Sequence, residues 1–393
     1  MQWASSISSD ENIETCIQKT CADVKSQLGD KTADLTVIFV SPHFKEDYSR
    51  IPDLIRKAME PGTLFGCSGG GIIGGGTEVE NNPAFSMTVA HLPDVSIKAI
   101  YSDTTTLPDQ DTGPRVWREW LGVDVESKPQ FIFLADPFSF RAEDFLAGVD
   151  FAYPNSKKVG GLASGAQSPG GNALYLGDKI YDKGLIGVAL CGNVQLDTIV
   201  AQGCRPIGQP MKITDCDHNL LKGVDNQPPM EILQELHSTL SESDQKLMQT
   251  SLFLGIEMDP FKEDPGMGDF LIRNLMGADR GNGAISIGAS LREGQLVQFH
   301  LRDKVMSAED LNVMLTRYHS QDKYEDARGA LLFSCLGRGQ HLYGTPNHDS
   351  DLFKKKLGDI PIGGFFCNGE IGPVGKTTFL HGYTSSFGIF RPA

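Results

Sequence analysis

The sequence has few basic residues and no long apolar segment. Lys and Arg number 35 against 50 Asp and Glu, so the formal net charge of the 393 residues is −15. Such an acidic chain repels phosphate groups, which excludes nucleic acids and anionic membranes as its main binding surfaces. The longest apolar runs, such as residues 35–40 and 131–135, are far too short to cross a bilayer.

Metal-binding and secretion signals are missing as well. The eight cysteines include no C-x-x-C pair, and the nine histidines include no H-x-x-x-H pair. Zinc sites usually depend on such close spacing, so we expect no metal and no cofactor. The N-terminal residues MQWASS lack the basic and apolar regions of a signal peptide. Together these features predict a protein of the reducing cytoplasm.

The 44 glycines gather at the ends of apolar segments, and this arrangement exposes an internal repeat. An apolar strand, a short helix and a second strand with glycines occur three times, at residues 37–67, 131–161 and 331–364. Gly66 follows Val37 at the same spacing as Gly160 follows Phe131. The spacing from Leu331 to Gly363 is slightly longer. This pattern predicts equivalent places for the three glycines.

A strand, a helix and a further strand form a β-α-β unit, in which the two strands pair in parallel. The segments that follow each unit, residues 85–90, 186–190 and 387–390, are expected to be antiparallel strands. We therefore predict an α/β fold of mixed sheets, built from pseudo-repeated β-α-β units with Gly-rich strand ends. Three unrelated β-α-β units would produce the same pattern, so that alternative stays open.

The chain is expected to form two modules. Prolines and a polar run at residues 222–250 suggest a boundary, which divides the chain into residues 1–225 and 226–393. The first module is expected to begin with an amphipathic helix over residues 8–29. Ser8 and Glu11 would form a capping box at its start.

Two short motifs match known patterns without the required context. Residues 66–70 read G-C-S-G-G, as in the nucleophile elbow of serine hydrolases, but the glycines after Ser68 cannot begin the helix that this elbow needs. Residues 375–378 resemble the end of a phosphate-binding loop, but Glu370 stands where that loop requires glycine. Both matches follow from the high glycine content.

The C-terminal third carries the most informative polar residues. Arg338 follows the first strand of the third unit, and Asn368 and Glu370 follow its second strand. The carboxyl ends of parallel strands lie at one sheet edge, where α/β proteins bind ligands. Arg338 can bind a carboxylate and Glu370 an ammonium group, which suits a small zwitterion. Alternatively, Arg338 and Glu370 pair with each other. His381 could contribute to such a site or make an ordinary structural hydrogen bond.

Several motifs together resemble the FIST domain family, with its N-terminal and C-terminal modules. The resemblance covers about residues 30–393 and is carried by segments 66–68, 187–190, 202–208, 299–303, 335–339, 363–372 and 380–384. The combination of C-x-G-R-G, G-E-I-G and H-x-Y-T is specific. The resemblance implies a sensory protein of signal transduction that binds a small ligand such as an amino acid. The segment before the first module is too short for an F-box, so the chain resembles the stand-alone form, whose output requires a separate signalling partner.

These observations lead to a set of candidate ligand-binding residues, and no catalytic residue is assigned. The candidates are Gly66, Cys67, Ser68, Ser164, Arg205, Cys335, Arg338, Cys367, Asn368, Glu370, His381, Tyr383 and Thr384. The alternative function is an enzyme that uses Ser68, Cys335 or Cys367 as a nucleophile on a small substrate. Arg338 could then lower the pKa of the Cys335 thiol. The sequence assigns no general base by spacing, so binding without chemistry is the favoured interpretation.

Overall fold

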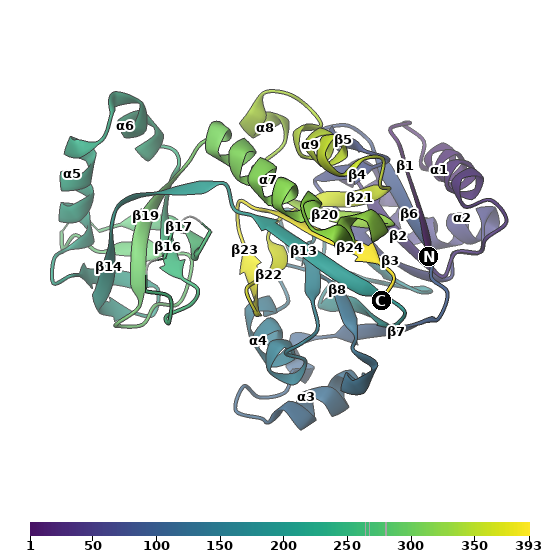
Figure 1. Ribbon diagram of the computed structural model, residues 1–393, viewed down its shortest axis with the longest axis horizontal. Helices are drawn as coiled ribbons and strands as arrows, with labels where there is room; N and C mark the ends of the chain where they lie inside the picture. Colours follow the sequence, from purple (N-terminus) through teal and green to yellow (C-terminus); the bar gives the residue numbers. More distant parts are fainter. Residues whose placement is uncertain (264, 267, 280) are drawn as a thin grey trace. The chain divides into compact units, whose positions relative to one another are not determined.

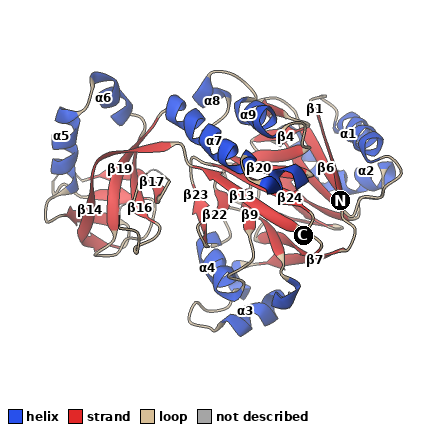
Figure 2. Cartoon of the chain, viewed as in Figure 1, coloured by secondary structure: helices blue, strands red, loops and turns tan. Residues whose placement is uncertain are grey.

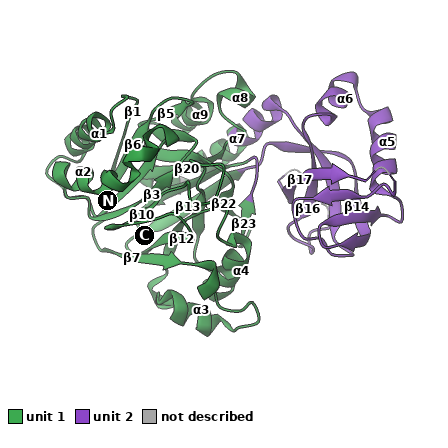
Figure 3. Ribbon diagram, turned by 180° about the vertical axis from the view of Figure 1, so that it is seen from behind, with its two compact units in different colours: residues 1–200, 312–380, 384–393 green, residues 201–311, 381–383 purple. Residues whose placement is uncertain are grey.

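The computed structural model describes residues 1–263, 265–266, 268–279 and 281–393, which form two compact units (Figure 3). The first unit comprises residues 1–200, 312–380 and 384–393, and the second comprises residues 201–311 and 381–383. The second unit is therefore an insertion in the sequence of the first. The boundary expected between residues 225 and 226 separates two modules along the sequence and is a different kind of division from these compact units. It stays a prediction.

Three repeats of one strand order build most of the first unit (Figure 1). The first repeat contains β2 (Leu35–Val40), η1 (Pro42–Arg50), α2 (Ile51–Ala58), β3 (Thr63–Ser68), β4 (Gly71–Gly74), β5 (Thr77–Glu80) and β6 (Phe85–His91). The second contains β8 (Gln130–Ala135), α4 (Ala142–Ala152), β9 (Lys158–Leu162), β10 (Leu174–Leu176), β11 (Lys179–Tyr181) and β12 (Leu185–Gly192). The third contains β20 (Gly329–Cys335), α8 (Gln340–Tyr343), α9 (His348–Leu357), β21 (Ile362–Cys367), β22 (Glu370–Val374), β23 (Thr377–His381) and β24 (Ser385–Arg391).

The pairing of these strands confirms the predicted α/β fold and its repeated units. β2 and β3 pair in parallel, as do β8 and β9, and β20 and β21. The last strand of each repeat, β6, β12 or β24, runs antiparallel beside the first strand of the same repeat. The two predicted pairing directions are therefore both confirmed.

The hairpins between these strands are exchanged among the repeats, which the sequence analysis did not anticipate. β4 of the first repeat pairs with β21 of the third, β10 of the second pairs with β3 of the first, and β22 of the third pairs with β9 of the second. Each six-stranded sheet of the first unit thus contains strands from two repeats. Every repeat therefore needs a hairpin from another repeat to form its full sheet.

Glycine is required where the two parallel strands of each repeat lie closest. A Cβ atom on Gly66 would lie 1.9 Å from the Ile38 carbonyl oxygen, and one on Gly160 would lie 1.8 Å from that of Phe133. In the third repeat the equivalent residue is Gly364, whose Cβ would lie 1.9 Å from the Leu332 oxygen. The sequence spacing had indicated Gly363, so that assignment was wrong by one residue. The unequal helical segment of the third repeat explains the difference.

The three sheets pack their inner faces around one core, and helices cover the outer faces (Figure 2). Val37, Ile132, Phe333 and Phe365 represent the apolar side chains of that core. The helices α1 (Ile13–Leu28) and α2 cover the first sheet, whereas α3 (Pro114–Leu121) and α4 cover the second. The remaining elements of this unit are β1 (Gln2–Ser8), β7 (Val95–Ser102), η2 (Thr104–Thr106), η3 (Val125–Ser127), β13 (Gln195–Ala201) and η4 (Asp322–Asp326).

The N-terminus differs from the expected helix over residues 8–29. Residues 2–8 form the edge strand β1 beside β6, and the helix begins only at Ile13. Asn12 caps it by accepting a hydrogen bond from the Thr15 N–H at 3.1 Å, so the predicted Ser8–Glu11 capping box was wrong. Residues 3–6 of this strand are all buried beside β6, and this tertiary pairing outweighs the local preference for a helix.

The second unit is a closed six-stranded barrel with two short helices. Its elements are β14 (Cys204–Asp217), β15 (Leu220–Val224), α5 (Pro229–Thr239), α6 (Glu242–Met248), β16 (Leu252–Glu257), β17 (Phe270–Ala278), β18 (Ile285–Ile287) and β19 (Leu296–Arg302). Leu254, Ile287 and Leu301 are among the side chains that fill the barrel. The helix α7 (Lys304–His319) follows it. In the described part of the chain, every helix is too short or too polar to span a membrane.

We expect Gly364→Ala to lower the free energy of unfolding by at least about 3 kcal/mol, because the added methyl group would overlap the Leu332 carbonyl oxygen. Gly113→Ala is the control, since a Cβ there meets open space and its φ of −71° is ordinary. It should cost no more than about 1 kcal/mol. Urea unfolding measures both values, and equal stability of the two variants would contradict the close approach.

Candidate functional site

The second strands of the three repeats end next to one another, and this brings several candidate residues together. The Ser164 N–H donates to the Ser68 carbonyl oxygen at 3.2 Å, and the Gly70 N–H donates to Ser164 Oγ at 2.9 Å. The Asn368 N–H donates to the Leu162 carbonyl oxygen at 3.1 Å. Ser68, Ser164 and Asn368 therefore lie at one junction of the first unit, where three Gly-rich turns meet.

Glu370 begins β22 at this junction and is completely buried. One oxygen of its carboxylate, Oε2, accepts hydrogen bonds from the Thr384 N–H at 3.1 Å and from Thr384 Oγ1 at 2.8 Å. The Thr384 carbonyl oxygen in turn accepts from the Cys335 N–H at 2.9 Å. Three candidates, Glu370, Thr384 and Cys335, thus form one connected group.

The other two repeats have apolar residues at the position of Glu370. In the strand pairing, Glu370 lies opposite Gly161, Ile72 lies opposite Phe365 and Leu174 lies opposite Cys67. These partners each follow the close-approach glycine of their repeat by one residue, so Glu370, Ile72 and Leu174 are equivalent. All three are fully buried. The fold itself therefore accommodates an aliphatic side chain at this position, and the carboxylate is a particular feature of the third repeat.

A hydroxyl group is sufficient for the hydrogen bond that Glu370 makes to the backbone of Thr384. In the first repeat the equivalent N–H, that of Ala84, donates to Ser41 Oγ at 3.0 Å. In the second repeat the Gly184 N–H donates to Ser139 Oγ at 2.9 Å. Burying a charge is costly when a neutral acceptor would satisfy the same donor. The need for a backbone acceptor therefore does not account for the charge of Glu370.

Two of the candidate thiols are inaccessible. Burial raises the pKa of Cys67 and of Cys367 well above the usual thiol value, and the Glu370 carboxylate adds to the effect on Cys367. A Cβ on Gly161 would lie 2.4 Å from Cys367 Sγ, so this sulfur is tightly packed. Cys335 is partly exposed, and its Sγ accepts from the Gly337 N–H at 3.4 Å. At neutral pH the two buried groups are therefore protonated thiols.

Ser68 is held by amide groups. Its Oγ lies 3.2 Å from Asn172 Oδ1 and accepts from the Ala173 N–H at 3.0 Å. The Tyr48 hydroxyl also bonds to Ser68, and burial raises the pKa of Tyr48 to about 12. An amide oxygen cannot take a proton as a general base, so these contacts hold the hydroxyl without activating it.

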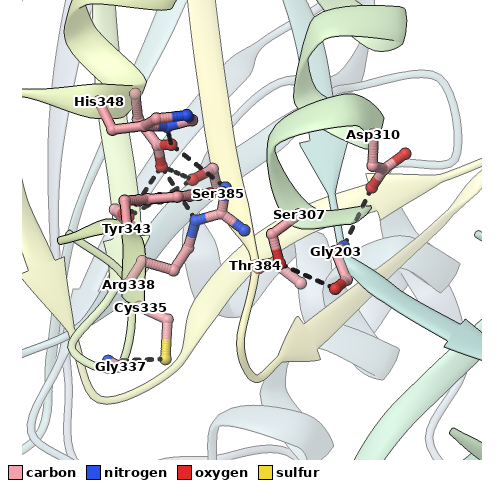
Figure 4. Close-up of polar contacts among 12 residues, drawn as sticks. Gly203, Ser307, Asp310, Cys335, Gly337, Arg338, Tyr343, His348, Thr384 and Ser385 are labelled. Carbon is pink, nitrogen blue, oxygen red and sulfur yellow. Dashed lines mark hydrogen bonds and ion pairs between the residues drawn. The ribbon is translucent and has the colours of Figure 1, made fainter. Parts of the chain in front are cut away.

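Arg338 is fully buried, and its carboxylate partner is Asp349 at the start of α9 (Figure 4). Nε lies 3.0 Å from Asp349 Oδ2, and Nη2 lies 3.2 Å from Oδ1 and also donates to the Tyr343 hydroxyl. Of the two alternatives drawn from the sequence, pairing of Arg338 with Glu370 is therefore not observed. Nη1, on the opposite edge of the guanidinium group, has no hydrogen-bond partner among the described residues.

Asp349 is the centre of this buried cluster. Ser385 Oγ donates to Asp349 Oδ2, and the His348 ring lies 3.0 Å from Oδ1. Burial alone would raise the pKa of Asp349, but the Arg338 guanidinium and these hydrogen bonds hold it well below its usual range. The same carboxylate keeps the pKa of Arg338 above the ordinary value despite burial. The pair is charged throughout the physiological range.

Glu78 of β5 approaches the same cluster from the first repeat. Its Oε1 accepts from the Ser350 N–H at 2.7 Å and from Ser350 Oγ at 2.8 Å. Burial, followed by repulsion from Asp349, raises the pKa of Glu78 to about 8. The Glu78 carboxyl group therefore links the hairpin of β4 and β5 to the start of α9 by hydrogen bonds. This group is largely protonated at neutral pH.

The remaining candidates belong to the second unit. Arg205 of β14 donates to Asp244, and its Nε lies 3.5 Å from Asp303. The Tyr383 hydroxyl donates to Asn274, and the Arg302 guanidinium lies 4.9 Å above the Tyr383 ring. His381 is buried. The Arg205 and Tyr383 side chains are thus held by contacts within the second unit.

Asp349 and Glu78 were missed at the sequence level. Asp349 stands in the polar run N-H-D-S-D, which is typical of any helix start, and Glu78 lies in a short alternating strand. The signal that could have found Asp349 is the buried Arg338 after a strand, which needs a carboxylate nearby. Among the residues that the structure describes, no three His, Cys, Asp or Glu side chains are placed to hold a metal ion.

Comparison with known proteins gives two adjoining domain matches. The FIST N domain matches residues 34–227, and the FIST C domain matches residues 229–373. An uncharacterized protein of Mycobacterium tuberculosis is 32% identical over 384 residues, with 98% of each chain covered. An uncharacterized protein of Mycobacterium bovis is 30% identical over 372 residues, covering 95% of this chain and 94% of its own. An F-box/LRR-repeat protein of Arabidopsis thaliana is 32% identical over 115 residues, 25% of this chain and 22% of its own.

We expect Asp349→Asn to destabilise the protein by about 3–5 kcal/mol, because it leaves the Arg338 guanidinium buried without a counterion. Glu119→Gln removes a carboxylate from the exposed pair with Arg115 and should change stability by less than about 1 kcal/mol. Chemical denaturation measures both. If Asp349→Asn were as stable as the control, the ion pair would not hold this cluster together.

We expect stability to depend on pH through Glu78. Its pKa is about 8 in the folded protein against 4.5 ordinarily, so the folded state binds its proton more tightly than the unfolded state. Stability should therefore fall as pH rises from about 4.5 to about 8, by an amount on the order of a few kcal/mol. Glu78→Gln removes this titration and should flatten the decline. Identical pH profiles of the variant and the wild type would contradict the assignment.

Proposed function

Because this chain belongs to the FIST family, whose domains serve as sensory domains of signal transduction, we propose that it senses a small ligand at Glu370. The observation that carries the proposal is the internal comparison of the repeats. Glu370 occupies a buried position that holds Ile72 and Leu174 in the other two. A buried carboxylate at a position that is aliphatic in the other two repeats supports a role in binding.

The ligand we propose is an amino acid or a similar small polar molecule. Glu370 would receive its ammonium group, since a desolvated carboxylate favours a cationic partner. Asn368 and Ser164 supply neutral polar groups at the same junction, and the Gly-rich turns keep backbone amides accessible. Arg338 would contribute Nη1 to the carboxylate or carbonyl end of the ligand, because its other nitrogens are engaged by Asp349.

Binding is favoured over catalysis by the state of the nucleophile candidates. Burial raises the pKa of Cys367 well above the usual range, so few thiolates form there near pH 7. The Arg338 guanidinium, which was expected to lower the pKa of the Cys335 thiol, is paired with Asp349 instead. Ser68 is bonded to the amide oxygen of Asn172. The site residues of the proposal, Cys335, Asn368, Glu370 and Thr384 with Ser164 and Arg338, all belong to the first unit.

The output of this sensor would pass to a separate signalling protein. The two FIST matches occupy residues 34–227 and 229–373, and both are sensory modules. The signalling step itself is therefore assigned to another protein. We place the protein in the cytoplasm, in keeping with its eight free cysteines.

Calorimetric titration with a panel of free L-amino acids tests the proposal. At least one amino acid should bind the wild type, and Glu370→Gln should weaken it by about 2–5 kcal/mol, since the carboxylate is fully desolvated. The amide oxygen of Gln can still accept from Thr384, which preserves the fold.

Glu119→Gln, an equal change at an exposed position, should bind as the wild type does. Unchanged binding by Glu370→Gln would place the site elsewhere. Failure of every amino acid to bind the wild type would overturn the proposed ligand class.

A further inference from the structure

The second unit contains a cavity that the proposed function does not use, which we call the α5 cavity. It has a volume of about 390 Å³ and lies between α5 and the barrel wall. Its apolar lining comes from Ile207, Met211, Ile232, Leu236 and Phe299. A volume of this size is within the range of small-molecule sites in proteins.

The pairing of β14 with β19 contains a bulge beside the cavity. Ile207 pairs with Phe299 and Met211 with Val297, so four steps along β14 correspond to two along β19. Gly208 adopts a φ of +67°, which other residues rarely take. Ile207, Gly208, Gln209 and Met211, at and beside this bulge, all line the cavity. Bulges of this kind are common beside binding sites.

The bulge is stabilised by a buried side chain. Gln298, which is 6% exposed, donates from Nε2 to the Gly208 carbonyl oxygen at 2.8 Å. This bond satisfies a carbonyl group that the interrupted ladder leaves without a strand partner. The Gln298 side chain thus stabilises the bulge beside the cavity, as expected of a preformed site.

The charges at the cavity are of one sign. Of the described residues that line it, the charged ones are Asp225 and Glu235, both exposed. Asp225 lies in a two-residue turn whose ends, Val224 and Gln227, are bonded to each other, and Glu235 lies on α5. An apolar interior with carboxylates at its edge complements a molecule with an apolar body and a positively charged group.

We propose that the α5 cavity is a second binding site, for a small apolar cation such as an aliphatic primary amine. The apolar lining takes the hydrocarbon part, and the carboxylates of Asp225 and Glu235 attract the ammonium group. This site shares no residue with the Glu370 site and does not depend on it.

Three probes with the same chain and different head groups test the proposal on the full-length protein: n-octylamine, n-octanol and n-octanoate. The Met211 methyl signal, assigned with Met211→Leu, reports on the cavity by NMR. Exposed ion pairs are weak, so octylamine should bind about threefold to tenfold more tightly than octanol. Octanoate should bind most weakly.

Variants with conserved shape separate charge from packing. Glu235→Gln with Asp225→Asn should abolish the preference for the amine, while the Asn oxygen can still accept from the Lys212 N–H. Glu231→Gln, an exposed change elsewhere on α5, should leave it intact. Leu236→Trp should fill the cavity and remove the Met211 response to octylamine. Glu370→Gln should bind octylamine as the wild type does.

Equal affinity for the three probes, or a preference for octanoate, would overturn the proposal. So would an amine preference that survives in the double variant. Absence of any Met211 shift with octylamine in the folded wild type would do the same without any variant.

Discussion

The structure of the first unit depends on the exchange of hairpins among its repeats. Each parallel strand pair leaves an open edge, and unpaired strand edges are unfavourable. A hairpin from another repeat covers that edge in every sheet. The three repeats must therefore fold together, although residues 201–311 of the second unit separate the second repeat from the third in the sequence. The same exchange brings the ends of β3, β9 and β21 to one junction, which is why residues so distant in the sequence form one candidate site.

The repeats also serve as controls for one another. Where a position is apolar in two copies and charged in the third, the charge is not required by the fold. Glu370 satisfies this test against Ile72 and Leu174. Ser334 and Ser385 show a similar difference in polarity without a charge, since the equivalent pairs are the apolar Val40 with Phe85 and Ala135 with Leu185. The third repeat has thus replaced apolar packing by the polar cluster of Arg338 and Asp349 on one side and by Glu370 on the other.

Local features of this fold were predictable from the sequence, whereas pairing between distant segments was not. Apolar runs such as residues 131–134, followed by a helix and by Gly160, identify a β-α-β unit because each requirement is local. The hairpin of β4 and β5 has the same alternating pattern whichever sheet it joins, so its pairing with β21 could not be read from it. The strand at residues 2–8 was mistaken for part of a helix because its partner, β6, lies far along the sequence. Arg338 and Glu370 were identified as charged strand ends, but Asp349 was overlooked because it resembles a helix-capping residue.

The central claim is that the buried carboxylate of Glu370 contacts a ligand. The most direct measurement is a crystal structure of the full-length protein grown with the amino acid that binds most tightly in calorimetry. The account predicts density for that molecule with its ammonium group within hydrogen-bond distance of the Glu370 carboxylate, beside Thr384 and Cys335. An amino acid bound elsewhere, with Glu370 bonded only to Thr384 and other protein groups, would contradict it.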